Sequence, residues 1–128
     1  MSTPDSTAEL VMTSEVLGIV PSAPLEVALR MMVEAGVRHL PVVERDRCVG
    51  LLHESDVLWR LWSTAGGTTL RVGAVARTPA VNVVASDDVH TIARRMVDAE
   101  TDAALVIESG QIVGIVTATD LLRRLAAD

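Results

Sequence analysis

The chain has 128 residues, which is enough for one hydrophobic core and leaves no room for a second large domain. Apolar residues make up 49% of the sequence and charged residues 22%, a balance that excludes a disordered chain. The net charge of -6 and the pI of 4.9 exclude a generally basic surface, so we expect neither nucleic acid nor a membrane as a partner.

The first half of the chain predicts the order strand, helix, strand, strand, helix. Apolar residues recur at helical spacing after Pro24, with Ser22 as a candidate N-cap and Gly36 as the stop. Two apolar runs joined by a charged turn predict a β-hairpin. The predicted elements are a strand at 16–20, a helix from Leu25 to the stop at Gly36, strands at 40–43 and 48–52, and a helix from about Ser55.

The second half predicts the same order of elements. They are a strand at 81–84, a helix at 89–99, strands at 104–107 and 112–116 joined by a turn at 108–111, and a helix at 119–127. Between the halves, residues 63–69 have the small, polar, glycine-containing composition of a linker. We therefore divide the chain into repeat 1 (1–62), a linker (63–69) and repeat 2 (70–128), which together form one structural module.

The two halves are copies of one unit. Shifting the sequence by 64 positions aligns Val11 with Val75 and continues to Leu61 and Leu125 without a gap. The identical pairs include Ser22/Ser86, Arg30/Arg94, Met32/Met96, Val42/Val106, Gly50/Gly114, Asp56/Asp120 and Leu61/Leu125. We predict an α/β (α+β) fold of two pseudo-symmetric β-α-β-β-α repeats, each a small, mostly antiparallel three-stranded sheet with two helices. Because about 60 residues bury only about 60% of their unfolded surface, we expect the halves to share a core.

Each repeat carries a glycine, two apolar residues, and an aspartate at a helix start. The segments are 50–57, with Gly50, His53 and Asp56, and 114–121, with Gly114, Thr117 and Asp120. Together with the duplication and the strand at 40–43, this resembles the tandem cystathionine β-synthase (CBS) domain pair, a Bateman-type regulatory module, over nearly the whole chain. The family motif is G-h-h-T/S-x-x-D, so His53 departs from it.

The resemblance implies a module that binds AMP, ADP, ATP or S-adenosylmethionine in clefts between the repeats. A carboxylate can accept hydrogen bonds from both ribose hydroxyls, and a helix N-terminus suits phosphate. In this family, each cleft takes its base-binding wall from one repeat and its aspartate from the other. The main site implied here contains Leu17, Gly18, Val37, Arg38, His39, Pro41, Thr117, Thr119 and Asp120.

The resemblance implies a weaker second site that contains Val81, Asn82, Thr101, Ala103, His53, Ser55 and Asp56. There Asp102 puts a negative charge at the position that Arg38 holds in the main site, so a phosphate would be repelled. We therefore expect one competent nucleotide site and one that is empty or accepts an uncharged nucleoside or a cationic sulfonium.

Other interpretations of these residues stay open. Asp56 and Asp120 could cap their helices, Thr117 could end a strand, and Arg38 could be a solvated charge. We expect Cys48 to be a core residue and predict no metal site, because no ligand cluster at metal-binding spacing accompanies the histidines. The dimer-interface candidates are Trp59, Trp62 and Arg123; the tryptophans share a helix face and could equally form a core pair.

We predict a non-catalytic sensor that modulates a separate effector protein, with an adenosyl nucleotide as regulatory ligand and no required cofactor. The alternative is a dimerisation or protein-interaction module that binds no ligand. No nucleophile triad or phosphate-binding loop favours an enzyme. The absence of a secretory signal and the single cysteine lead us to expect a cytoplasmic protein, and the mean hydropathy of +0.37 leads us to expect a homodimer.

Overall fold

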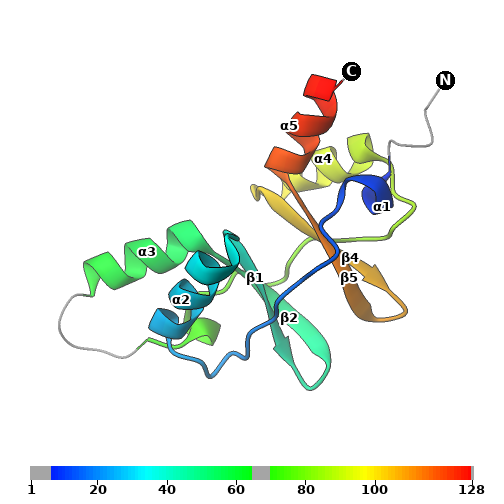
Figure 1. The fold of residues 1–128 in the computed structure, drawn as a ribbon. Helices are drawn as coiled ribbons and strands as arrows, with labels where there is room; N and C mark the ends of the chain where they lie inside the picture. Colours follow the sequence, from blue (N-terminus) through cyan, green and yellow to red (C-terminus); the bar gives the residue numbers. More distant parts are fainter. Residues whose placement is uncertain (1–6, 65–69, 128) are drawn as a thin grey trace. The chain divides into compact units, whose positions relative to one another are not determined.

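The computed structural model describes residues 7–64 and 70–127, so part of the predicted linker (65–69) lies outside the described residues. The described residues form five α-helices and five strands, and Figure 1 shows the ribbon with the main elements labelled. The helices are α1 (Ala8–Val11), α2 (Leu25–Ala35), α3 (Glu54–Ser63), α4 (Val89–Asp98) and α5 (Ala118–Ala127), with a short 3-10 helix at Val72–Ala74. The strands are β1 (His39–Glu44), β2 (Arg47–His53), β3 (Asn82–Val83), β4 (Ala103–Glu108) and β5 (Gln111–Thr117). The predicted order strand, helix, strand, strand, helix is confirmed in repeat 2, whereas repeat 1 has no first strand among the described residues.

The chain divides into two compact units, residues 17–80 and residues 1–16 together with 81–128. In the first unit, β1 and β2 form an antiparallel hairpin whose turn places Arg45 and Asp46 at positive φ. Gly36 ends α2 in the left-handed conformation, at a φ of 68°, as its position after the apolar periodicity predicts.

The second unit holds the three-stranded sheet β3-β4-β5, with β3 parallel to β4 and β4 antiparallel to β5. The hairpin turn contains Ser109 and Gly110 at positive φ. Asp88 caps α4, because its side chain accepts a hydrogen bond from the backbone N–H of His90 at 2.6 Å.

The leading segment of each repeat joins the sheet of the other repeat. Thr13 pairs with Ile115 on β5 through two backbone hydrogen bonds of 2.9 and 3.0 Å. Arg77 pairs with Leu51 on β2 in the same way, at 2.9 and 3.0 Å. These pairs occupy equivalent positions of the two repeats, so the compact units do not coincide with the sequence repeats.

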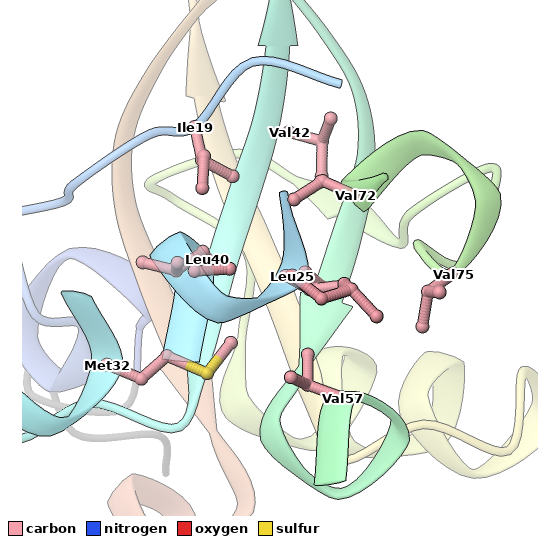
Figure 2. Packing of buried hydrophobic residues seen from close by; sticks show 10 residues of the cluster. Ile19, Leu25, Met32, Leu40, Val42, Val57, Val72 and Val75 are labelled. Carbon is pink, nitrogen blue, oxygen red and sulfur yellow. The ribbon is translucent and has the colours of Figure 1, made fainter. Parts of the chain in front are cut away.

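Among the described residues, each unit has a core cluster of its own. Figure 2 shows the cluster of unit 17–80, in which α2 and α3 contribute Leu25, Met32 and Val57. Val72 and Val75 complete this cluster from the leading segment of repeat 2. The other unit packs Ala8 of α1 against its own sheet and helices in the same manner. Exchange of the short leading segments therefore completes both cores.

Two local predictions were wrong. The expected strand at 16–20 is reduced to one parallel bridge between Ile19 and Val42, because Pro41 on β1 has no N–H to extend the ladder. Ser22 does not cap α2. Pro24 is the residue at the cap, and no side chain there accepts a hydrogen bond from the helix.

Candidate functional site

Thr117 and Asp120 form a reciprocal cap at the N-terminus of α5. The backbone N–H of Thr117 donates to Oδ2 of Asp120 at 2.8 Å, and the Thr117 hydroxyl donates to the same oxygen at 3.1 Å. In return, the backbone N–H of Asp120 donates to Thr117 Oγ1 at 3.4 Å. This is the arrangement of a capping box, so the capping interpretation of Asp120 holds.

Capping leaves part of the Asp120 carboxylate for a ligand. Within the part of the chain that the structure describes, both hydrogen bonds to this side chain end on Oδ2. Oδ1 therefore keeps its lone pairs, and Asp120 is only partly buried. Each ribose hydroxyl donates to one acceptor lone pair, and Oδ1 offers two. A capping aspartate can therefore still bind a ribose.

Asp56, the equivalent residue of repeat 1, is held differently. Nε of Arg77 donates to Asp56 Oδ2 at 2.8 Å, and Nη2 of Arg77 donates to Oδ1 at 3.3 Å. Both carboxylate oxygens thus accept from one guanidinium. His53, which precedes α3 where Thr117 precedes α5, makes no side-chain cap.

One residue in the leading segment of each repeat determines this difference. Thr13 bridges β5 where Arg77 bridges β2, so the repeat symmetry puts a threonine beside the Asp120 motif and an arginine beside the Asp56 motif. Sequence analysis missed both residues, although the alignment of Val11 with Val75 also aligns Thr13 with Arg77. The missing information was that the leading segments are exchanged between the repeats.

The motif glycines make room for these exchanged segments. A Cβ on Gly50 would lie 2.8 Å from the carbonyl oxygen of Arg77 and 2.7 Å from Cγ2 of Thr78. A Cβ on Gly114 would collide with the side chain of Met12. Each glycine therefore allows close approach of the segment that carries Arg77 or Thr13.

Unit 17–80 contains its share of the predicted site residues, and contacts link some of them to the β1–β2 hairpin. Gly18 lies over β1, where a Cβ would be 3.1 Å from Cγ2 of Val43. The carbonyl oxygen of Arg38 accepts the backbone N–H of Glu54 at 2.9 Å, which joins the start of β1 to the start of α3. The predicted residues in this unit are Leu17, Gly18, Val37, Arg38, His39, Pro41, His53, Ser55 and Asp56.

The other unit repeats this arrangement. Asp102 accepts the backbone N–H of Ala118 at 2.8 Å through its carbonyl oxygen, and Ala103 pairs with Thr117. Val81 accepts the backbone N–H of Leu105 at 2.8 Å. The predicted residues placed in this unit are Val81, Asn82, Thr101, Ala103, Thr117, Thr119 and Asp120. The combinations of residues from both repeats remain predictions.

Trp59 and Trp62 are surface residues of α3, with exposed fractions of 67% and 81%. The core-pair interpretation is therefore wrong for both tryptophans. Leu58 on the same helix is 48% exposed, and Arg123 on α5 is exposed. Helix α3 thus carries an apolar surface.

Cys48 is partly buried in β2, where its thiol donates to the carbonyl oxygen of Gly50 at 3.3 Å. Burial raises the pKa of the Cys48 thiol, and the hydrogen bond to Gly50 opposes this effect. A thiol with a raised pKa is a poor nucleophile at neutral pH. Cys48 is only partly buried and is in neither core cluster, so the expected core position is not confirmed.

Comparison with known proteins identifies the family. The family model of the CBS domain matches the chain twice, over residues 8–63 and 72–127, so the chain belongs to the CBS domain family and contains a CBS pair. The fold is that of the matched CBS pair structures, and a CBS pair is a regulatory module. None of the helices in the described residues is long and apolar enough to cross a membrane.

Three similar proteins illustrate the range of the family. An uncharacterized conserved protein from Pyrococcus horikoshii is 26% identical, with a TM-score of 0.83 and coverage of 97% of this chain and 95% of that chain. The cytosolic domain of the Mg²⁺ channel MgtE, solved in complex with ATP, is 26% identical, with a TM-score of 0.75 and coverage of 94% and 49%. Inosine-5'-monophosphate dehydrogenase of Thermoplasma acidophilum is 28% identical over 91% of this chain and 23% of its own length. The chain spans 23% to 45% of the length of the curated relatives it matches.

Proposed function

We propose that this CBS pair is a non-catalytic sensor that binds one adenosyl nucleotide (AMP, ADP, ATP or S-adenosylmethionine) and modulates a separate partner protein. The proposal keeps the cytoplasmic setting and the unidentified effector expected from the sequence. Its main support is the geometry of Asp120. One oxygen of this carboxylate, Oδ2, caps α5, and the other, Oδ1, is left as an acceptor for a ligand. The ATP complex of the similar MgtE domain also supports an adenosyl ligand.

In the proposed main site, Asp120 accepts hydrogen bonds from the ribose through Oδ1. Thr117 and Thr119 lie at the N-terminus of α5, where backbone N–H groups and the helix dipole favour a phosphate. Leu17, Gly18 and Val37 supply an apolar wall, and Arg38 and His39 supply positive charge or hydrogen-bond donors. The joint use of both repeats rests on the family resemblance.

The same physical chemistry supports unequal sites. Arg77 already satisfies both oxygens of Asp56, so a ribose at the second site would have to displace a guanidinium. A ligand at Asp120 displaces no such group. We therefore propose that the residues of the second site bind weakly or not at all while Arg77 holds Asp56.

Thermal unfolding with and without each adenosyl ligand tests the proposal, with GTP as the non-adenosyl control. A ligand at about 100 times its Kd adds about 2.7 kcal/mol, which for a domain of this size is on the order of 10 °C. Asp120→Asn preserves an acceptor for the cap but removes the charge, so the ligand-induced shift should largely disappear. Asp56→Asn is the matched control and should keep the shift. An absence of any shift in the wild type would contradict nucleotide sensing.

The exposed apolar face of α3 favours a second proposal, that two copies associate through this helix. Trp59 and Trp62 together with Leu58 form an apolar surface of the kind that oligomer interfaces cover. Sedimentation of a Trp59→Ala, Trp62→Ala double variant should show a monomer, whereas Leu10→Ala, which changes an exposed leucine outside α3, should leave a dimer. A double variant that sediments like a wild-type dimer would refute this interface.

A further inference from the structure

His39 and His53 are direct cross-strand neighbours at the end of the β1–β2 hairpin. The strand register pairs His39 with His53, and the two ring centroids are 4.9 Å apart with an angle of 77° between the ring planes. Neither histidine has a second metal ligand at a usual spacing along the chain, which is why sequence analysis predicted no metal site. Strand pairing creates a two-histidine arrangement that the linear sequence does not display.

The two rings lie on one face of the hairpin. The adjacent pair, Leu40 and Leu52, is fully buried in the core of α2 and α3. Because side chains alternate along a strand, His39 and His53 both project from the opposite face. His53 is 3% exposed, and His39 is partly exposed. The pair therefore combines one ring fixed by its surroundings with one that solvent can reach.

The distance between the rings suits a shared metal ion. One imidazole nitrogen of His39 lies within 4.8 Å of one of His53. Two nitrogen ligands of a tetrahedral zinc ion, each about 2.0–2.1 Å from the metal, are roughly 3.3 Å apart. Rotation of the partly exposed His39 ring can close this difference. The steep angle between the ring planes is no obstacle, since each ring needs only to direct its own nitrogen lone pair at the ion.

We propose that His39 and His53 bind a divalent transition-metal ion such as Zn²⁺, Co²⁺ or Ni²⁺ through one imidazole nitrogen each. Imidazole nitrogen is a preferred ligand of these ions, whereas Mg²⁺ and Ca²⁺ prefer oxygen. Two protein nitrogens leave further coordination positions for water or other donors. The proposal does not require nucleotide binding, because neither Thr117 nor Asp120 takes part in it. His39 also belongs to the proposed main nucleotide site and His53 to the second site, so the metal is tested without nucleotide.

Metal titration of the full chain without an affinity tag, in the absence of nucleotide, tests the site. Zn²⁺ binding is measured by calorimetry, and Co²⁺ binding is measured by its visible absorption, with Mg²⁺ as the comparison ion. The variants are His39→Gln and His53→Gln. His90→Gln is the matched control, because it removes an exposed histidine of α4 that has no place in the pair.

The proposal predicts one Zn²⁺ per chain in the wild type and in His90→Gln. It also predicts at least a tenfold loss of affinity in His39→Gln and in His53→Gln, and no comparable binding of Mg²⁺. If substitution of the buried His53 prevents folding, as circular dichroism would show, His39→Gln at the partly exposed position decides the question. Wild-type protein that does not bind Zn²⁺, or His39→Gln protein that binds it as tightly as the wild type, would overturn the proposal.

Discussion

Arg77 holds both oxygens of the Asp56 carboxylate, with donor–acceptor distances of 2.8 Å from Nε and 3.3 Å from Nη2. Its counterpart in the other unit is Thr13, which bridges β5 as Arg77 bridges β2. The two copies of the aspartate motif therefore differ in a neighbour that comes from outside the motif. This neighbour is the structural basis of the proposal that the two sites are unequal.

Exchanging these neighbours should change the sites. Thr13→Arg places a guanidinium beside the Asp120 motif and should remove most of the ligand-induced rise in Tm. Arg77→Thr should leave that rise intact and add a second, weaker binding event in calorimetry. Since the side chains of Arg77 and Asp56 are 43% and 32% exposed, losing their ion pair should cost only about 0.2–1 kcal/mol of unfolding free energy. Unchanged ligand binding in Thr13→Arg would contradict this role of the exchanged residue.

The cap at α5 should contribute to stability without any ligand. Thr117→Val removes the hydroxyl that donates to Asp120 and accepts from its backbone N–H. The unfolding free energy, measured in urea, should fall by about 0.5–2 kcal/mol. Thr117→Ser keeps the hydroxyl and is expected to stay close to the wild type. A loss in Thr117→Ser without a loss in Thr117→Val would show that the methyl group, and not the capping bond, stabilises this turn.

Gly50 and Gly114 should tolerate alanine to different degrees. At Gly50 the new Cβ meets the backbone carbonyl of Arg77 at 2.8 Å, which only a shift of the backbone can relieve. At Gly114 it meets the side chain of Met12, which can change rotamer. We expect Gly50→Ala to lose on the order of 1–3 kcal/mol and Gly114→Ala to lose less. Urea unfolding of the two variants in parallel measures both losses. A larger loss in Gly114→Ala than in Gly50→Ala would contradict this prediction.

Cys48 should react slowly with thiol reagents in the folded protein. Burial raises its pKa, so the thiol stays protonated to a higher pH than a free cysteine. Its contribution to stability is present below the unfolded pKa and is lost as pH rises through the folded pKa. Labelling at pH 8 should therefore be slower than for the urea-unfolded chain. Equal rates in the folded and unfolded protein would mean that β2 does not protect this thiol.

The sequence alone predicted the parts of the fold that depend on local pattern and duplication. The stop at Gly36, both hairpins and the helices after His53 and Thr117 follow from periodicity and turn residues. The strand expected at 16–20 is only a bridge at Ile19, because its pairing partner β1 contains Pro41. Local pattern carries no information about such a partner.

The candidate site was predictable only in part, for a similar physical reason. Repeat alignment located Asp56 and Asp120. It did not predict that the Arg77 guanidinium would donate to Asp56. The contact of Arg77 with Asp56 and the pairing of His39 with His53 both arise from chain segments that meet only after folding. Both contacts follow from strand pairing, which composition and spacing do not specify.

Calorimetric titration of the wild-type chain with ATP, AMP and S-adenosylmethionine, in parallel with Asp120→Asn and Asp56→Asn, tests the central claim most directly. The unequal geometry of the two aspartates predicts one high-affinity adenosyl ligand per chain, lost in Asp120→Asn and kept in Asp56→Asn. Two equivalent sites, no binding of any of the three ligands, or loss of binding in Asp56→Asn alone would contradict the account.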